Sequence, residues 1–184
     1  MTDQIDKKAL RTDMVGRRAA VHGTVDAGPA HENLRRVLTG ATHPISFYWP
    51  IRTEIDPRPV MEAFAPSDPV CLTVTQGYAP LIFRQWQPQT RMDTDGFGVA
   101  IPADTAEMTP RTLVIPMLAF DTRGQRLGYG AGHYDRTLEQ LRARHTVQAI
   151  GFAYAAQECA CVPVEATDQL LDMIVTETGI LTFG

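Results

Sequence analysis

The sequence predicts an α/β domain with a largely parallel sheet. Short apolar runs rich in Val, Ile and aromatic residues recur along the chain, and segments of helical or turn character separate them. The length of 184 residues is sufficient for one full hydrophobic core, and no internal repeat or low-complexity tract divides the chain. We therefore expect a single domain over residues 1–184.

Each predicted element follows from a local pattern. Residues 3–20 are expected to form a helix, because Leu10 and Met14 lie one turn apart among mostly polar and basic positions. Residues 22–32 contain Gly and Pro and are expected to be loose, and residues 88–111 are rich in turn formers, which indicates a long loop. The remaining predicted elements are strands at 45–51, 70–75, 81–86, 113–120, 148–154 and 173–177, and helical or loop segments such as 57–65 and 133–144 lie between them.

Composition argues against several classes of protein. A net charge of −4 and an isoelectric point of about 5.7 make nucleic acid a poor candidate for the main partner. No apolar run approaches the roughly 18 residues that a membrane-spanning helix needs, and the N-terminal MTDQIDKKALR lacks the apolar stretch of a signal peptide. Cys71, Cys159 and Cys161 form neither an even disulfide framework nor two metal-ligand pairs, so we expect reduced thiols in a cytoplasmic protein.

The densest motif is RLGYGAGHYDR, residues 126–136, in which Gly128, Gly130 and Gly132 alternate with other residues. The motif follows the predicted strand 113–120 and leads into a helix, and parallel sheets bind ligands at the carboxyl ends of their strands. Backbone N–H groups of such a loop can converge on phosphate oxygens. The spacing differs from the dinucleotide and Walker patterns, and a simple turn without a ligand is the alternative.

Asp135 favours a ligand over a simple turn. A carboxylate in the first turn of a helix interacts favourably with the helix dipole, which by itself needs no ligand. Beside a bound polyphosphate the same carboxylate would repel it unless a divalent cation lay between them, and Mg²⁺ prefers one or two carboxylates together with substrate phosphates. Arg126 and Arg136 flank the loop and can neutralise the remaining charge. The motif therefore indicates a site for a nucleoside triphosphate with Mg²⁺.

The wider segment PMLAFDTRGQRLGYGAGHYDRTL resembles the signature of the 5-formyltetrahydrofolate cyclo-ligase family, P-G-x-x-F-D-x-x-G-x-R-L-G-x-G-x-G-Y-Y-D-x-x-L. Three further elements occur in the family's order. KKALR is similar to its leading K-x-x-L-R helix, ISFYWPIRTEID to a strand and Glu-containing loop, and VPVEATDQLLDMIVTE to its closing segment. The matching residues of the signature are Pro116, Phe120, Asp121, Gly124, Arg126, Leu127, Gly128, Gly130, Gly132, Tyr134, Asp135 and Leu138.

The resemblance implies roles for individual residues. Arg126 and Asp135 would be catalytic, and Asp135 and Asp168 would place Mg²⁺. Trp49 would form a wall of the folate pocket, and Glu54 would hold the amide-like edge of the pterin. Further folate contacts would come from Tyr129, Gly130, Ala131, Gly132 and His133, and the ATP contacts from Lys7, Arg11, Arg126, Leu127, Gly128, Tyr129, Gly130, Ala131, Gly132, His133 and Tyr134.

Local alternatives stay open for several of these residues. Lys7 and Arg11 share one helix face, which can bind a polyphosphate or simply be solvated. Glu54 can be a solvated strand end and Trp49 a core residue. Asp168 can cap a helical turn over residues 169–172, with or without a role in metal binding.

Three positions depart from the family signature. Met117 replaces the usual Gly, and Ala131 stands where the family often has Gly or Lys, so a phosphate-binding cation is missing there. His133 replaces the usual Tyr and either donates a hydrogen bond or fills the same space. The segment 88–111 aligns loosely, with Phe97 in the place of an aromatic residue.

The resemblance implies a three-layer α/β/α fold, similar to that of sugar-phosphate isomerases and CoA transferases, and an ATP-dependent ring closure. The enzyme would convert 5-formyltetrahydrofolate to 5,10-methenyltetrahydrofolate with Mg²⁺, releasing ADP and phosphate. It would act on small molecules as a monomer or weak homodimer, without nucleic-acid or membrane partners. The alternatives are a non-catalytic folate- or nucleotide-binding sensor of the same fold and, more remotely, a sugar-phosphate isomerase.

Overall fold

A seven-stranded sheet organises the computed structural model, which describes residues 6–183. Its strands lie in the order β11-β10-β9-β6-β1-β2-β3. The five inner strands run parallel, whereas the edge strands β3 and β11 pair antiparallel with their neighbours. The bounds are β1 Ile45–Phe47, β2 Val70–Val74, β3 Ile82–Gln85, β6 Thr112–Ile115, β9 Gln148–Phe152, β10 Met173–Thr176 and β11 Gly179–Thr182.

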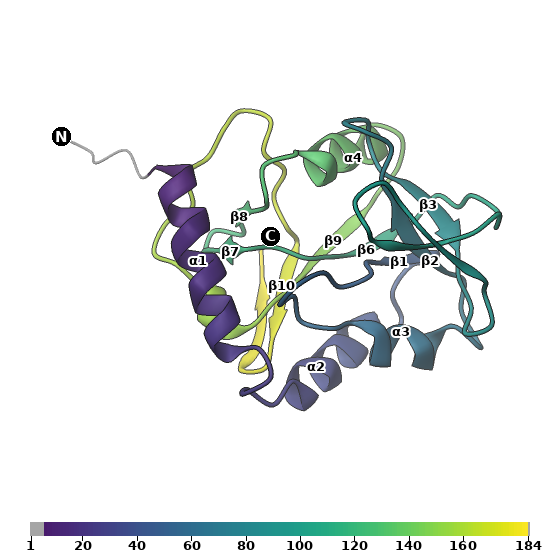
Figure 1. Cartoon of the computed structure of the whole chain (residues 1–184), viewed down its shortest axis with the longest axis horizontal. Helices are drawn as coiled ribbons and strands as arrows, with labels where there is room; N and C mark the ends of the chain where they lie inside the picture. Colours follow the sequence, from purple (N-terminus) through teal and green to yellow (C-terminus); the bar gives the residue numbers. More distant parts are fainter. Residues whose placement is uncertain (1–5, 184) are drawn as a thin grey trace.

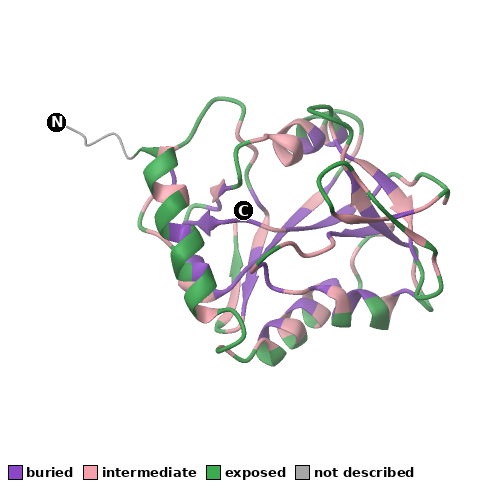
Figure 2. Cartoon of the chain, in the orientation of Figure 1, coloured by how far each residue is buried: buried purple, intermediate pink, exposed green. Residues whose placement is uncertain are grey.

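Helices cover both faces of this sheet (Figure 1). α2 (Gly28–Leu38) and α3 (Arg58–Phe64) lie on one face, and α4 (His133–Arg142) lies on the other. Successive residues of a strand point to opposite faces, so Val114 packs with the α2 and α3 side while its neighbours Leu113 and Ile115 pack with the α4 side. Figure 2 shows burial along the strands and the inner sides of these helices. The predicted three-layer α/β class with a mostly parallel sheet is confirmed.

The first helix, α1 (Lys7–Val21), lies beside the β7–β8 hairpin rather than on the main sheet. Met14 is fully buried there against Leu118, Ala119 and Leu127. The helix predicted over 3–20 is confirmed from residue 7 onward, and residues 3–5 lie outside the described part of the chain. Across residues 6–183, no helix combines the length and apolarity needed to cross a membrane.

Two of the predicted strands, whose apolar runs both contain a proline, are much shorter than those runs. The run 45–51 forms a strand only as far as Phe47. The run 113–120 does not form one strand: β6 ends before Pro116, which has no N–H to donate to a ladder. The chain then leaves the sheet and pairs as β7 (Ala119–Phe120) with β8 (Arg126–Leu127).

The prediction that residues 22–32 are loose is wrong from residue 28 onward. α2 begins there, with Pro29 in its first turn, where the missing N–H of proline costs nothing. Ala30, Leu34 and Leu38 are spaced as one face of a helix, and all three are buried.

The segment 88–111, predicted as a long loop, contains a β-hairpin of β4 (Met92–Thr94) and β5 (Ala100–Pro102). Asp95 holds its turn, because Oδ1 accepts hydrogen bonds from the N–H groups of Phe97 at 2.8 Å and Val99 at 2.9 Å. The polar composition that suggested a loop is that of a hairpin tip. Cys71, Cys159 and Cys161 are free thiols, as predicted.

Candidate active site

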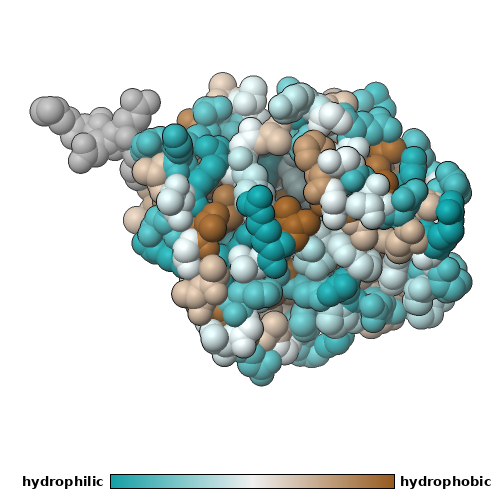
Figure 3. All heavy atoms as spheres, in the orientation of Figure 1, coloured by the Kyte–Doolittle hydropathy of each residue, from teal (hydrophilic) through white to brown (hydrophobic). Residues whose placement is uncertain are grey.

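A pocket of about 580 Å³ opens at the carboxyl ends of β1, β2 and β6. β1 and β6 are neighbours, and the chain continues from β1 toward β2 on one side and from β6 toward β9 on the other. Such a switch point in a parallel sheet leaves a crevice where ligands bind. The surface is hollowed at this place, between α1 and α4 (Figure 3). Every predicted site residue lines the pocket, namely Lys7, Arg11, Trp49, Glu54, all of residues 126–135, and Asp168.

The backbone requires glycine at two of the three glycine positions of the loop. Gly130 and Gly132 have φ angles of +103° and +67°, which side-chain-bearing residues rarely adopt. A Cβ at Gly132 would also lie 2.8 Å from the Arg136 guanidinium. Gly128 has no such φ, and a Cβ there would meet nothing within 4 Å. The backbone conformation of a turn is enough to explain glycine at positions 130 and 132. It does not explain Gly128, where the space next to the backbone is open to the pocket.

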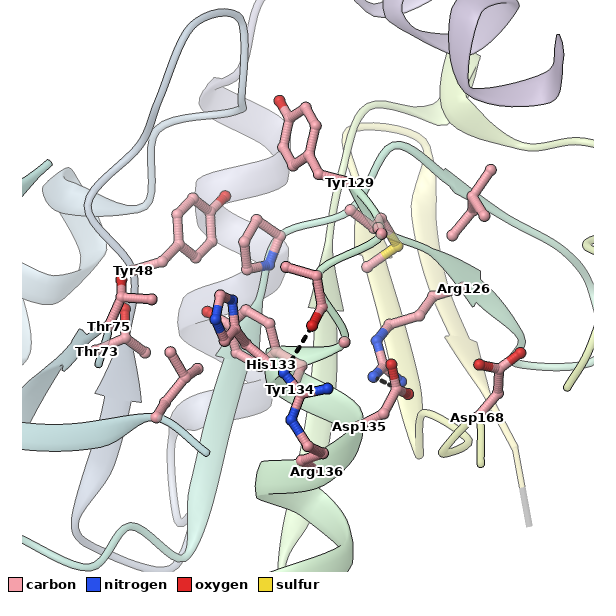
Figure 4. A pocket seen from close by; sticks show the side chains of 18 of the residues that line it. Tyr48, Thr73, Thr75, Arg126, Tyr129, His133, Tyr134, Asp135, Arg136 and Asp168 are labelled. Carbon is pink, nitrogen blue, oxygen red and sulfur yellow. Dashed lines mark hydrogen bonds and ion pairs between the residues drawn. The ribbon is translucent and has the colours of Figure 1, made fainter. Parts of the chain in front are cut away.

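Arg126 is bound to protein groups rather than free for a ligand (Figure 4). Its side chain is only 6% exposed, Nη2 lies 2.6 Å from Asp135 Oδ1, and Nη1 donates to the carbonyl oxygen of Gln169. Asp135 Oδ1 also accepts a hydrogen bond from the Gln169 N–H at 3.0 Å. Burial lowers the pKa of Arg126, against the opposing charge of Asp135. Arg126 therefore fixes Asp135 and the closing segment of the chain.

Lys7 and Arg11 reach the pocket instead of facing solvent. Lys7 Nζ lies 2.8 Å from Glu165 Oε1 and 3.3 Å from Asp168 Oδ2. Burial opposes the charge of Lys7, but the hydrogen bond to Glu165 and the charge of Asp168 outweigh it, so its pKa is raised. Arg11 Nε donates to the carbonyl oxygen of Gly128 at 3.0 Å. The alternative of a solvated basic face is wrong for these two residues.

Asp168 does not cap a helix, because residues 169–172 form no helical turn. Its Oδ2 accepts the Glu165 N–H at 2.8 Å and the Lys7 ammonium. Within residues 6–183, neither Oδ1 of Asp168 nor Oδ2 of Asp135 accepts a hydrogen bond. The same residues contain no cluster of three or more His, Cys, Asp or Glu arranged for a metal ion. Each of the two aspartates thus has one oxygen available for a ligand.

The opposite end of the pocket is built around Glu54, which is 5% exposed. Its Oε2 accepts the Ile51 N–H at 3.0 Å, and Oε1 lies 4.0 Å from Arg18 Nη1. Burial raises the pKa of Glu54 to about 7, although the Ile51 hydrogen bond and the charges of Arg18 and Arg52 oppose this. Glu54 is therefore not a solvated strand end.

Aromatic side chains line the same pocket as this carboxyl group. Trp49 is half-buried at the pocket, with the Arg58 guanidinium 4.9 Å from its ring centre. Tyr129 lies between two guanidinium groups, 5.6 Å from that of Arg18 and 5.4 Å from that of Arg52. This end of the pocket offers flat apolar faces and one buried carboxyl group.

The residues that depart from the family signature are held by the protein. His133 Nε2 lies 2.7 Å from the carbonyl oxygen of Gly77 and must donate to it, since a carbonyl only accepts. At Ala131 no cationic side chain is present, but Arg136 from α4 reaches back and donates to the Ala131 carbonyl oxygen at 2.6 Å. A guanidinium therefore lies under the loop beside the position where the family often has a lysine.

Comparison with known proteins decides the family. The sequence profile of the 5-formyltetrahydrofolate cyclo-ligase family matches residues 3–177, nearly the whole chain. The chain belongs to this family. It is therefore an enzyme of the ligase class.

Individual members of the cyclo-ligase family show the extent of the similarity. The 5-formyltetrahydrofolate cyclo-ligase of Escherichia coli K12 is 30% identical over 146 residues, which cover 75% of this chain and 80% of that protein. The Mycolicibacterium smegmatis cyclo-ligase is 29% identical, with 92% of this chain and 93% of that protein covered. In fold, the 5,10-methenyltetrahydrofolate synthetase of Aquifex aeolicus superposes with a TM-score of 0.76 at 22% identity, covering 96% of this chain and 92% of that one.

The family signature did not identify several side chains that line or support the pocket. Tyr48, Thr73 and Thr75 line the pocket and lie at or next to the carboxyl ends of β1 and β2. In a parallel sheet, any polar residue at such a strand end is a candidate for the ligand site. Arg18 had a signal in the sequence: it continues the helical stripe of Lys7, Arg11 and Met14 at positions i, i+4, i+7 and i+11. A basic residue on the same helix face as an apolar Met indicates that its charged group lies inside the protein.

Proposed function

We propose that this cyclo-ligase family member uses ATP to close the ring of 5-formyltetrahydrofolate, giving 5,10-methenyltetrahydrofolate, ADP and phosphate. One observation carries the proposal. A single pocket is lined both by a glycine loop with cations beside it, which suits a polyphosphate, and by a buried carboxyl group and aromatic side chains, which suit a pterin. The two substrates would meet where these two ends adjoin.

The phosphate end of the pocket is the group formed by Lys7, Arg11, the glycine loop and Arg136. Gly128 leaves the open space through which phosphate oxygens can approach the backbone. Lys7 and Arg11 supply cations from α1, and Arg136 supplies one from beneath the loop. Their present partners are carboxylates and carbonyls, which phosphate oxygens can replace.

Mg²⁺ fits the carboxylates that line the same end. Asp135 and Asp168 each keep one carboxylate oxygen without a protein hydrogen bond among the described residues. One or two carboxylates together with substrate phosphates are the ligands that Mg²⁺ usually takes. When bound there, the ion would neutralise charge that develops on the transferring phosphoryl group. Arg126 acts at this point as the residue that orients Asp135.

The folate end of the pocket is the group formed by Trp49, Glu54 and Tyr129. A pterin presents adjacent N–H donors on one edge, and a carboxylate is the acceptor that matches them. Trp49 and Tyr129 offer flat faces for the rings. The buried position of Glu54 strengthens its hydrogen bonds, because no water competes there.

The chemistry then needs alignment rather than a protein nucleophile. The formyl oxygen on N5 attacks the γ-phosphorus, and the bond from phosphorus to the bridging oxygen of ADP breaks. N10 attacks the formyl carbon and loses its proton, and the carbon–oxygen bond breaks to release phosphate. Holding both substrates in position can supply roughly 7–11 kcal/mol of the barrier. Fixed cations stabilise the charge on the transferring group.

The direct test is incubation with 5-formyltetrahydrofolate and ATP, following the absorbance of the methenyl product. The product is expected only when both ATP and a divalent cation are present. Binding of the folate without turnover would favour the sensor alternative. Product formation that does not depend on ATP would contradict the proposal.

A further inference from the structure

Arg18 is a charged side chain almost completely inside the protein, behind the folate end of the pocket. It is 1% exposed. Nη1 donates to the carbonyl oxygen of Met117 at 3.2 Å and Nε to Thr53 Oγ1 at 3.1 Å, while Nη2 donates to the Tyr129 hydroxyl. The guanidinium therefore ties α1 to the end of β6, to the loop before Glu54 and to the glycine loop.

A buried guanidinium needs an anionic partner, because burial of an unpaired charge is unfavourable. Glu54 supplies it: Oε1 lies 4.0 Å from Arg18 Nη1, and both side chains are buried. The other charged or titratable groups near Glu54 are Arg52 in its own loop, Tyr48 after β1 and Tyr134 on α4. Arg52 is exposed, and burial raises the pKa of both tyrosines, which keeps them neutral. Arg18 is thus the buried cation that faces Glu54.

We propose that Arg18 is a positioning residue for folate recognition, which orients the Glu54 carboxylate and the Tyr129 ring toward the bound pterin. Arg18 itself contacts protein groups and not the open pocket, so it acts through these two side chains. The role rests on the proposed function, because it assumes that Glu54 and Tyr129 bind the folate.

The electrostatics of Glu54 make this role measurable. With Arg18 in place, the pKa of Glu54 is about 7, so the carboxyl group changes its charge within the working range of an enzyme assay. An opposite charge within about 4–6 Å lowers the pKa of a carboxyl group by roughly one to three units. Loss of Arg18 should therefore protonate Glu54 at neutral pH, which weakens its hydrogen bonds to a pterin.

The experiment compares Arg18→Gln and Arg18→Lys with a matched control, Arg17→Gln. Arg17 is the neighbouring residue, half-exposed, and pairs with Asp13 at 2.9 Å on the surface. The KM values for 5-formyltetrahydrofolate and ATP are measured from pH 6 to 9. Separately, the Glu54 carboxyl group is titrated by ¹³C NMR in the substrate-free protein.

For Arg18→Gln we expect the KM for folate at pH 7 to rise about fivefold or more, since a rise of one unit from a pKa of about 7 lowers the ionised fraction of Glu54 at pH 7 from about one half to about one tenth. The rise should shrink above pH 8, and the KM for ATP should stay within about twofold of the parent value. The Glu54 titration should move upward by about one unit or more. Arg18→Lys keeps the charge but not the three-way hydrogen bonding, so its changes should be smaller, and Arg17→Gln should match the parent.

An unchanged Glu54 titration together with an unchanged folate KM in Arg18→Gln would overturn the proposal. So would equal losses for folate and ATP at every pH, which indicate a structural role only. If Arg18→Gln does not fold, Arg18→Lys decides: its charge should keep the Glu54 titration near that of the parent, but it loses the hydrogen bonds to Thr53 and Tyr129, so a folate KM equal to the parent value at every pH would overturn the proposal. If the parent shows no turnover, the proposed function fails, whereas the NMR titration still reports whether Arg18 controls Glu54.

Discussion

The phosphate end and the folate end of the pocket place their charges in different ways. At the phosphate end, Asp135 and Asp168 pair with Arg126 and Lys7 at 2.6 and 3.3 Å, and each also accepts a backbone N–H. At the folate end, Glu54 is buried and accepts one backbone N–H, and its arginine lies 4.0 Å away.

The difference fits the roles proposed for the two ends. Ion pairs between partly exposed groups contribute little to stability, so Lys7 and Asp168 can exchange partners when a ligand arrives. A buried carboxyl group with a distant cation keeps hydrogen-bonding capacity for a ligand, but its charge is held weakly. The ion pair of Lys7 and Asp168 at the phosphate end can therefore open for a ligand. At the folate end, the buried Glu54 carboxyl group changes its charge near neutral pH.

Asp135→Asn tests the phosphate end with the largest expected effect. The substitution removes the charge that faces Arg126 and weakens the free oxygen available to Mg²⁺, so turnover should fall by roughly 10²–10³. Turnover is measured at saturating ATP and folate, together with thermal melting.

Asp172→Asn is the matched control for this variant. Asp172 also pairs with an arginine, Arg142 at 3.1 Å, and accepts a backbone N–H, that of Ala149 at 2.6 Å, but it lies outside the pocket. Both variants should lose stability to a similar degree, and only Asp135→Asn should lose turnover. Equal turnover in the two variants would show that Asp135 has only a structural role.

Replacing both Lys7 and Arg11 with Gln tests whether α1 supplies cations to the phosphates. Each residue would lose a charge-assisted hydrogen bond worth roughly 1.5–3 kcal/mol, or about tenfold or more in ATP affinity. The loss should be larger for ATP than for ADP, and smallest for folate, which binds at the other end.

Titrations with ATP, ADP and 5-formyltetrahydrofolate measure this order directly. Lys8→Gln, an exposed change on the same helix, is the control. Unaltered ATP affinity in the double variant would show that α1 does not bind the nucleotide.

The glycine loop, the α/β class and most strands could be predicted from the sequence because their signals are local. The loop is one short run of alternating glycines, and a strand is one apolar run. The prediction is wrong at Pro116, where the chain leaves the sheet, and over α2, where Gly and Pro begin a helix although their composition indicates a loop. The resemblance to sugar-phosphate isomerases and the monomer or weak-dimer state stay predictions.

The partners of the site residues could not be predicted, since they come from distant parts of the chain. The motif places Arg126 at the pocket, but its partners Asp135 and Gln169 are not part of that prediction. Arg18 meets Tyr129, which is 111 residues away, and no local pattern contains that contact. Motif spacing thus predicts which residues line a pocket, whereas packing decides which of them are free for a ligand.

Gly128→Ala and Gly130→Ala separate a need for ligand space from a need of the backbone. A Cβ at Gly128 meets no protein atom within 4 Å, so Gly128→Ala should change stability by less than about 1 kcal/mol. It should nevertheless weaken ATP binding by about fivefold, equivalent to about 1 kcal/mol, because the methyl group occupies the phosphate approach. At Gly130 the φ of +103° makes alanine strained, and that variant should be destabilised by roughly 1–3 kcal/mol. Parent-like ATP affinity in Gly128→Ala would place the phosphates elsewhere.

The last expected effect, on stability alone and not on ligand binding, comes from the buried carboxyl group at the folate end. Burial raises the pKa of Glu54 from 4.5 to about 7 in the folded protein, so the folded state binds this proton more tightly than the unfolded chain does. The resulting stabilisation is complete below about pH 4.5 and is lost as the pH rises through 7. Between pH 5 and 8 the free energy of unfolding should therefore fall by roughly 2–3 kcal/mol more in the parent than in Glu54→Gln. Urea unfolding at several pH values measures this, with Glu62→Gln as the exposed control. Parallel pH curves for the parent and Glu54→Gln would mean that the carboxyl group is ionised throughout, and that the two ends of the pocket hold their charges alike.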